Sequence, residues 1–362
     1  MVKLGEIFTI SRGGSPRPIQ DYITDSCHGV NWIMIGDTEP NSKYIRHTAK
    51  KIKFEGVKKS RKVYPGDLLL TNSMSFGRPY ILDVEGCIHD GWLVLSPKNN
   101  QIHIDYFYHY LNSPAAKIII SNKAAGAVVK NLNSDIVRNL EIPFPPFAEQ
   151  VRIASTLDKV DGIRQKRDQA IKLADDFLRA TFLAMFGDPV ENPKRWDVAS
   201  LLEYGSFKNG MNFTKGESGS VLKCLGVGNF KSLATITCMD NIGEIELNTL
   251  PSDDYLLKDG DIVFVRSNGN KALVGRCLTI YPGKEKVTFS GFCIRYRIEN
   301  TAITPEYLNF LFRTPSMKQQ MLSGGQGANI QNISQGTLSA LRIPVPPLEK
   351  QQAFSKVVSF HS

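Results

Sequence analysis

A segment of this chain returns at a constant distance of 201 residues, and this internal repeat limits the folds that the chain can adopt. Residues 140–146 read Leu-Glu-Ile-Pro-Phe-Pro-Pro, and residues 341–347 read Leu-Arg-Ile-Pro-Val-Pro-Pro. Between residues 105 and 153, twelve residues are identical to the residue 201 positions later, including Gln150 and its counterpart Gln351. The repeat is far longer than a solenoid unit, so each copy has the size of a domain. Two similar domains in one chain usually bind two similar objects, or two halves of one.

The repeat extends upstream, although its offset changes. A turn leading into a buried strand is expected over 63–70, and its counterpart over 257–265 lies 194 residues later, so the second copy carries a net insertion before the offset reaches 201. Between these points, residues 91–95 match residues 291–295 by sequence. A short helix is expected over 105–111 and again over 306–312, because the Ser-Pro or Thr-Pro that follows disfavours continuation. The pattern predicts the α+β class, with two similar α/β domains.

The residues between the two copies predict one long helix. Residues 147–186 contain no proline and a single glycine, Gly162. A helix of about 38 residues would be roughly 57 Å long, more than two small domains can cover, so it needs a partner helix as in a coiled coil. Its apolar residues recur at steps of three and four: Ile153, Leu157, Val160, Ile171, Ala174, Leu178 and Met185.

The sequence therefore divides into four parts. Residues 1–146 form the first domain, 147–186 the long spacer helix, 187–347 the second domain, and 348–362 the start of a second spacer helix. By comparison with the first spacer helix, this last part is truncated, with about 14 residues where the repeat predicts about 40.

Composition narrows the class of partner and the compartment. The net charge of +9 and the isoelectric point of about 9.1 favour an anionic partner, nucleic acid first. Six cysteines without a Cys-x-x-Cys pair argue against a zinc site or a disulfide framework and indicate reduced thiols. No apolar run is long enough to span a membrane, and the N-terminus lacks a signal-peptide core. We expect a cytoplasmic protein.

Motifs for catalysis, cofactors and metals are missing from the sequence. It contains no phosphate-binding loop, and Gly226-Val227-Gly228 is only half of a dinucleotide fingerprint. The six histidines show no metal-ligand spacing. Asp67 and Asp261 lie in matching turns, where a nuclease carboxylate is conceivable but a turn-stabilising role is favoured. We expect no catalytic residue, no metal and no cofactor.

The order of these features resembles a known family. Both copies end in Ile-Pro-x-Pro-Pro-x-x-x-Gln, and the link after the long helix reads Phe-Gly-Asp-Pro over 186–189, followed by Asn-Pro-Lys over 192–194 and by Trp196. This arrangement resembles the specificity subunit of a type I restriction–modification system over essentially the whole chain.

The resemblance implies a non-catalytic subunit with two target-recognition domains, each of which reads one half of an asymmetric bipartite site in double-stranded DNA. It also implies two long helices that pair antiparallel. Two methyltransferase subunits and motor–nuclease subunits would assemble around the chain and carry out adenine methylation or restriction. The short second helix departs from the family pattern. It leaves open a truncated or decoy DNA-binding form, or a coiled coil completed by a second copy or another chain.

In such a domain, DNA-reading residues are expected on polar loops, because phosphates attract Lys and Arg while base edges bind Arg, Asn, Gln, Ser and Thr. Ordinary surface loops are the alternative. The expected DNA-binding residues of the first domain are Arg12, Arg17, Asn72, Ser73, Ser75, Arg78, Lys130 and Asn131. Those of the second are Lys208, Arg266, Asn268, Asn270, Lys271, Gln326, Asn329, Gln331 and Asn332.

A cluster of basic residues lies outside these loops. Residues 50–62 include seven Lys or Arg side chains. A solvated face is one reading of this run, and a phosphate clamp with strong salt dependence is the reading that we favour in a recognition domain.

Overall fold

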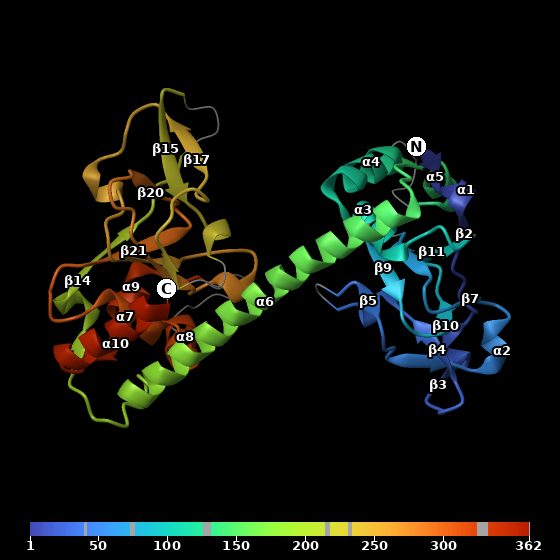
Figure 1. The fold of residues 1–362 in the computed structure, drawn as a ribbon. Coiled ribbons are helices and arrows are strands. Elements are labelled where there is room, and N and C mark those ends of the chain that lie inside the picture. The colour runs from blue at the N-terminus through green and yellow to red at the C-terminus, as the bar shows by residue number, and fades with distance from the viewer. Residues whose placement is uncertain are drawn as a thin grey trace. The chain divides into compact units, whose positions relative to one another are not determined.

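The computed structural model describes residues 1–39, 42–72, 77–125, 132–213, 218–230, 234–323 and 332–361. These residues divide into two compact units, Met1–Arg167 and Asp168–Ser362, which are described separately below (Figure 1).

The first unit is built on two five-stranded sheets. The first sheet has the order β2-β11-β8-β9-β5, and its strands are β2 (Phe8–Arg12), β11 (Trp92–Pro97), β8 (Leu68–Thr71), β9 (Pro79–Leu82) and β5 (Tyr44–Ile45). The second has the order β3-β6-β4-β10-β7, with β3 (Ile23–Thr24), β6 (Lys50–Ile52), β4 (Val30–Ile33), β10 (Gly86–Ile88) and β7 (Arg61–Val63). A separate pair joins β1 (Val2–Lys3) to β12 (Glu141–Ile142).

Helices cover one face of the first sheet. They are α1 (Leu4–Ile7), α3 (Ile104–Asn112), α4 (Pro114–Ala125), α5 (Ser134–Arg138) and the start of α6 (Phe147–Phe186), while α2 (Phe54–Val57) and the 3-10 turns Ile19–Asp21 and Ile35–Asp37 belong to the region of the second sheet. Side chains alternate along the central strands. Leu70 and Leu93 pack with Phe107 of α3, whereas Leu69 and Trp92 pack toward the second sheet. The strands are therefore buried on both faces.

The second unit repeats this plan. Its first sheet has the order β14-β21-β18-β19-β16, with β14 (Gly205–Asn209), β21 (Cys293–Ile298), β18 (Asp261–Val265), β19 (Cys277–Ile280) and β16 (Thr235–Ile236). Its second sheet has the order β17-β15-β20, with β17 (Glu244–Leu247), β15 (Ser220–Leu225) and β20 (Val287–Phe289). Its helices are α7 (Pro305–Phe312), α8 (Pro315–Ser323), α9 (Gln335–Ser339) and α10 (Leu348–His361), and its 3-10 turns are Leu201–Glu203, Val227–Asn229, Asp253–Tyr255 and Lys271–Leu273.

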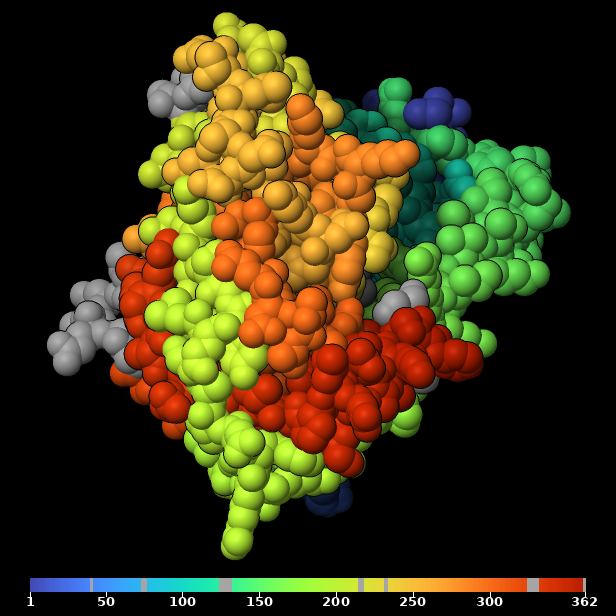
Figure 2. Space-filling model, turned by 90° about the vertical axis from the view of Figure 1, so that its left-hand side faces the viewer, coloured from blue at the N-terminus to red at the C-terminus, as the bar shows by residue number. Residues whose placement is uncertain are grey.

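The segment that follows α6 pairs with residues near the C-terminal end of the second unit. The strand β13 (Val198–Ser200) pairs antiparallel with β22 (Arg342–Pro344), as β1 pairs with β12 in the first unit. In Figure 2 the yellow-green residues that follow α6 accordingly lie beside the red C-terminal residues on the surface. The first sheet has the same strand order in both units, although the second sheet has five strands in one unit and three in the other. The predicted α+β class, with two similar domains and a long helix, is confirmed.

The sequence alignment of one strand was wrong by one residue. Leu68 lies opposite Leu95, and at the matching place Ile262 lies opposite Tyr296, so the offset in this strand is 201 and not 200. The match of residues 91–95 with 291–295 was based on the glycine that begins both segments, Gly91 and Gly291. In the sheet, the alternation of inward and outward side chains sets the register, and a slip of one residue would exchange the two faces.

One buried glutamine in each unit joins the proline segment to the residues just before α3 or α7. Gln150 accepts a hydrogen bond from the His103 amide at 3.0 Å and donates to the carbonyls of Gln101 and Pro145. Gln351 accepts from the Thr304 amide at 2.9 Å and donates to Ala302 and Pro346. Both side chains are fully buried. We call these three bonds the glutamine clasp; the first clasp lies at the start of α6 and the second at the start of α10.

The helix expected over 147–186 is α6, an uninterrupted helix of 40 residues (Figure 1). Its predicted apolar stripe is covered only in part. Leu178 is buried and Ile153, Ala174 and Met185 are half-buried, whereas Leu157, Val160 and Ile171 are exposed. The described parts of the chain therefore leave the middle of the stripe open to solvent.

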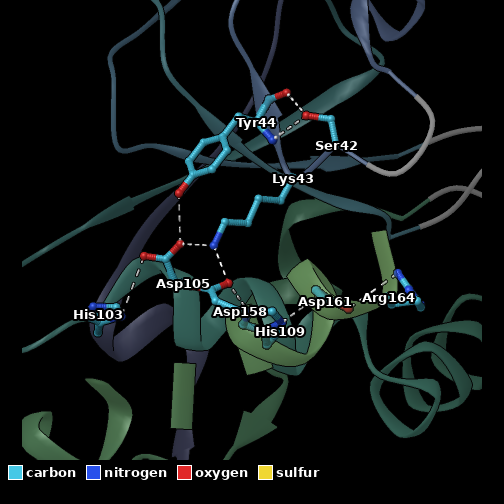
Figure 3. Close-up of polar contacts among 9 residues, drawn as sticks. All are labelled: Ser42, Lys43, Tyr44, His103, Asp105, His109, Asp158, Asp161 and Arg164. Carbon is cyan, nitrogen blue, oxygen red and sulfur yellow. Dashed lines mark hydrogen bonds and ion pairs between the residues drawn. The ribbon is translucent and has the colours of Figure 1, made fainter. Parts of the chain in front are cut away.

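A polar cluster anchors the start of α6 to the first unit (Figure 3). Lys43 Nζ lies 2.7 Å from Asp105 Oδ1 of α3 and 2.6 Å from Asp158 Oδ1 of α6. His109 Nε2 lies 2.8 Å from the same Asp158 oxygen. Burial opposes ionisation of Asp158, but the hydrogen bonds from Lys43 and His109 outweigh it and lower the pKa of this carboxyl below its ordinary value. Asp158 is therefore charged near neutral pH and holds the helix against α3.

The second unit anchors its two helices differently. Glu306 stands at the position of Asp105 and accepts hydrogen bonds from Tyr281, which directly follows β19, and from Ser355 on α10. The end of α6 adds Phe182 and Phe186, which pack against Phe354 at ring-centroid distances of 5.5 and 5.7 Å. Aromatic burial thus replaces much of the ionic contact seen in the first unit.

Candidate nucleic-acid interface

Three polar segments of the first unit meet at one end of its first sheet. Arg12 at the end of β2 lies opposite Leu93, and Thr71 at the end of β8 lies opposite Trp92. The segments that follow β2 and β8 and the turn that precedes β11 therefore lie side by side. Sequence reasoning predicted the first two segments as DNA-reading loops, and the sheet register explains why they adjoin.

Asp90, in the turn before β11, is the residue on which these segments converge. Its backbone carbonyl accepts hydrogen bonds from Arg12 Nε at 3.0 Å and from Asn72 Nδ2 at 2.6 Å. Its carboxylate accepts a hydrogen bond from Ser15 Oγ at 2.9 Å and lies 3.7 Å from the Arg17 guanidinium. Residues from two loops are thus held by a single turn residue, and we call this arrangement the Asp90 hub.

Close backbone contact supports the hub. The Gly13 amide donates to the Trp92 carbonyl, and a Cβ atom at Gly13 would lie 2.0 Å from the His89 carbonyl. The second unit has the same contact, because a Cβ atom at Gly210 would lie 2.0 Å from the Ser290 carbonyl. Only glycine fits at either place. The loop base is therefore a shared scaffold, whereas the residues around it differ between the units.

The charge states around the hub follow from their neighbours. The hydrogen bond from Ser15 holds the pKa of Asp90 below its ordinary value, and the positive charge of Arg12 acts in the same direction. Burial lowers the pKa of His89. The Gly91 amide donates to His89 Nδ1 at 2.9 Å, which also requires the neutral ring. At neutral pH the hub holds a carboxylate beside a neutral imidazole.

The structure assigns different surroundings to the predicted residues of the first unit. Arg12 and Arg17 are exposed, whereas Asn72 is only 3% exposed and its amide is bonded to the hub. Arg78 is exposed, but it stacks on Tyr80 at 5.2 Å and lines a different pocket, of about 860 Å³, together with Lys43, Lys117 and Arg164.

An apolar pocket adjoins the hub. Its volume is about 630 Å³, and Arg17, His89 and Asp90 belong to its lining. The remaining walls are mostly apolar side chains of the second sheet region, including Ile23, Trp32 and Met34. Arg17 therefore stands at the rim of a hollow, where its side chain has little packing around it.

In the second unit, Arg266 follows β18 as Asn72 follows β8. The Arg266 amide donates to Phe292, and the Arg266 carbonyl accepts from Ile333. The next residue, Ser267, forms a bridge with Asn332. Arg266 and Asn332 are both exposed, so the structure brings these two predicted residues together at the surface.

The other predicted residues of the second unit occupy a turn and a strand. Asn268 accepts from the Asn270 amide, and Asn270 in turn caps the 3-10 turn that begins at Lys271. Lys271 is exposed. Lys208 on β14 lies 3.4 Å from Asp254 and stacks on Tyr255 at 4.6 Å, so its charge is partly neutralised within the unit.

Seven predicted residues lie outside the part of the chain that the structure describes: Ser73, Ser75, Lys130, Asn131, Gln326, Asn329 and Gln331. Their DNA contacts stay predictions.

The basic run at 50–62 folds along the second sheet of the first unit. Several of its lysines bond to their own domain: Lys53 Nζ donates to the Asp21 carbonyl, Lys59 Nζ to the Tyr22 hydroxyl, and Lys62 lies 2.7 Å from Glu85. These three lysines are nevertheless exposed, as are Lys50, Lys58 and Arg61. Arg61 Nε also donates to the Arg12 carbonyl at 3.4 Å. The exposed members are the ones suited to a phosphate contact.

The two turn aspartates have structural partners. Asp67 accepts from the Tyr64 amide and from the Ser96 hydroxyl. Asp261 accepts from the Lys258 amide and forms a bidentate pair with Arg297, at the position of Ser96. Asp261 is only 2% exposed. These contacts support the turn-stabilising role that the sequence favoured over a nuclease carboxylate.

Two residues of the hub escaped the sequence predictions. A search for cationic and amide side chains passes over Asp90, because an acid next to phosphates is unfavourable. Ser15 lies within the first predicted loop, but nothing in its type separated it from neighbouring serines. The register of β2 and β11 was the signal that could have found both.

Two further searches of the described residues were negative. No helix within the described ranges is long and apolar enough to cross a membrane. Among the same residues, no group of three or more His, Cys, Asp or Glu side chains is arranged to hold a metal ion.

Comparison with known proteins identifies relatives of the whole chain. The family model "Type I restriction modification DNA specificity domain" matches residues 1–173 and 213–360. The StySPI specificity subunit of a type I restriction enzyme from Salmonella potsdam is 25% identical, over 82% of this chain and 67% of the relative. The EcoKI specificity subunit from Escherichia coli K12 has the same identity and coverage. The MjaVIII specificity subunit from Methanocaldococcus jannaschii is 23% identical, over 98% and 84%.

A solved structure shares the fold. The crystal structure of the type I restriction–modification S subunit from M. genitalium matches with a TM-score of 0.52 and 17% identity, over 99% of this chain and 88% of that one.

Proposed function

Because the chain belongs to the type I restriction modification DNA specificity family, we propose that each of its two units reads one half of an asymmetric bipartite DNA site. The observation that carries this proposal is the repeated scaffold with different side chains at equivalent loop positions. Both units place a glycine against the turn before the central strand, but one surrounds it with Arg12, Arg17 and Asp90 and the other does not. A similar scaffold with different polar side chains on its loops suits two half-sites of different sequence.

The exposed cations and amides at these sheet ends are the proposed DNA contacts. In the first unit they are Arg12 and Arg17, with Asn72 supporting the loop from within. In the second unit, Arg266 and Asn332 form the centre of the surface, and Lys271 extends it. Arg78, Lys208, Asn268 and Asn270 are proposed as flanking contacts, and exposed Lys58 and Arg61 as phosphate contacts of the first unit.

The chain supplies recognition and its partners supply the chemistry. Methyltransferase subunits, expected in two copies, would methylate adenine at the bound site, and motor–nuclease subunits would restrict unmethylated DNA. The relatives are named as specificity subunits of restriction enzymes, which supports a non-catalytic role for this chain within such a complex.

The exposed stripe of α6 is the proposed contact for a further helix. Val160 is 55% exposed, and Leu157, Ile163 and Ile171 are also exposed. A helix from a second copy or from another chain would bury these side chains in a coiled coil.

Methylome sequencing of a host with and without the gene tests the function. Loss of one split adenine-methylation motif is expected when the gene is deleted. If every motif persists, the proposed function is wrong. Co-expression with the methyltransferase subunit of the same operon, followed by mass measurement of the purified complex, tests the stoichiometry; two methyltransferase subunits per chain are expected.

A further inference from the structure

Arg17 is exposed, yet its direction is restrained. Its side chain is 84% exposed and stands at the rim of the apolar pocket beside the hub. The Asp90 carboxylate, 3.7 Å away, is the ionic partner of its guanidinium. Asp90 is itself fixed, because Ser15 Oγ donates to its carboxylate and lies 3.5 Å from its amide. The Asp90 turn therefore supplies the ionic partner toward which this long, loosely packed side chain is drawn.

Arg12 is restrained from the same turn. Its Nε atom donates to the Asp90 carbonyl, which leaves the two terminal nitrogens of its guanidinium directed away from this bond. Asn72 Nδ2 donates to the same carbonyl. The Asn72 backbone is itself held, because its amide donates to the Gly91 carbonyl and its carbonyl accepts from the Leu132 amide. The Asp90 carbonyl is thus held in place as firmly as its carboxylate.

A guanidinium drawn toward a neighbouring carboxylate is suited to reading a base. The O6 and N7 atoms of guanine accept two parallel hydrogen bonds from arginine in the major groove, and this geometry requires a guanidinium plane of set orientation. A phosphate also binds arginine through two hydrogen bonds, but it accepts Lys as well and carries no sequence information. We propose that Asp90 is a positioning residue which presents Arg17 to a guanine in the half-site read by the first unit.

The second unit offers an internal reference. Gly291 stands at the position of Asp90, 201 residues later, so no carboxylate is available there. A Cβ atom at Gly291 would lie 2.0 Å from the side-chain oxygen of Asn212, the residue at the position of Ser15. The positioning device therefore belongs to the first unit alone, and changes in Asp90 act on one half-site only.

The inference rests on the proposed function and is tested with the full chain bound to its methyltransferase subunit. Once the split site is mapped, each guanine of both half-sites is replaced in turn by 7-deazaguanine, which removes the N7 acceptor and keeps the base pair. We expect one guanine in one half-site at which this replacement weakens binding about tenfold, within the range for one bidentate base contact.

Three variants then assign the contact. With Arg17→Ala, the effect of 7-deazaguanine at that guanine should fall to about onefold, because the partner of N7 is gone. With Asp90→Asn, the loss of binding caused by 7-deazaguanine should become several-fold smaller. Binding to duplexes in which the half-site of the first unit is changed should stay as in the wild type. Asp83→Asn is the matched control. It removes the same charge from an exposed ion pair with Arg46 at the opposite end of β10 and should leave every effect unchanged.

The outcomes separate the two proposals. If Arg17→Ala weakens binding to all duplexes equally, Arg17 contacts a phosphate and the inference is overturned. If Asp90→Asn leaves the 7-deazaguanine effect at its full size, Asp90 has no positioning role. Since Arg17 is exposed, its variant tests the guanine contact even where Asp90→Asn disturbs the turn. If the wild-type complex shows no preference for any split site, the proposed function itself fails.

Discussion

At the scale of single residues, small and acidic side chains determine where the larger polar ones lie. Gly13 lets the first loop touch the turn at His89, and Asp90 then collects Arg12, Arg17, Ser15 and Asn72. The candidate DNA contacts are thus the outermost members of a hydrogen-bonded group, and their positions depend on residues that need not touch DNA.

The neutral state of His89 makes the first unit sensitive to acid. Burial lowers the pKa of His89 in the folded state, so below about pH 6.5, the ordinary histidine value, the unfolded chain binds a proton more readily. Stability is present above that pH and is lost as the pH falls toward the folded-state pKa. His89→Asn keeps an acceptor for the Gly91 amide but cannot be protonated.

We expect the melting temperature of the wild type to fall more than that of His89→Asn between pH 7.5 and pH 5.5, in a thermal unfolding series. Equal falls in the two proteins would show that another group causes the loss.

The glutamine clasps should contribute equally to the two units. Gln150→Ala and Gln351→Ala each leave buried backbone groups without a partner, at a cost of about 2–4 kcal/mol. Hydrogen exchange should detect the loss in α3 for the first variant and in α7 for the second, while Gln169→Ala on the exposed face of α6 has little effect. A loss that spreads over both units from one variant would contradict the expectation.

What the sequence predicted at this scale follows from residue type. Arg12 and Arg17 were found because cations on glycine-rich loops suit DNA, and both are exposed. Asn72 was predicted because an amide on a polar loop suits base edges, but the structure buries it, and its side chain donates to the Asp90 carbonyl. Periodicity and composition describe neighbours along the chain, whereas Asp90 is 78 residues from Arg12 and only the sheet brings them together.

At the scale of elements, the long helix was predictable in full and its attachment was not. Forty residues without proline, with apolar residues at steps of three and four, predict one helix, and α6 begins and ends where the proline segment and Gly187 indicate. The pairing of Lys43 with Asp105 and Asp158 depends on a loop, a short helix and the long helix meeting in space. No spacing in the sequence encodes that meeting.

Asp158→Asn should weaken the attachment of α6 to the first unit. The change removes the charge that balances Lys43 and His109, while Asp105 still pairs with Lys43. Since Asp158 is partly exposed, the expected loss is about 1 kcal/mol in free energy of unfolding. Chemical denaturation measures it.

Asp176→Asn is the control for the Asp158 variant, because it removes the same charge from a more distant turn of α6. If Asp176→Asn lowers the free energy of unfolding as much as Asp158→Asn does, the loss comes from the change in net charge and not from the contacts of Asp158 with Lys43 and His109.

At the scale of the whole molecule, the length of α6 is expected to set the gap between half-sites. Duplication of residues 165–171 adds about 10.5 Å of helix, close to three base pairs at 3.4 Å each, and keeps the seven-residue phase of a coiled coil. The methylation motif should keep both half-sites and gain about three unread base pairs. If the number of unread base pairs in the methylated motif stays the same, the length of α6 does not set the spacing of the half-sites.

The glutamine clasp also bears on how such a protein can change over generations. Each clasp is complete within its own repeat, since Gln150 and Gln351 bond only to groups that travel with them. A crossover between genes in the helix just after either glutamine therefore transfers an entire recognition domain with its clasp intact. Recombination can thus replace a whole recognition domain, and with it the recognised half-site, without a new contact between domain and helix having to evolve.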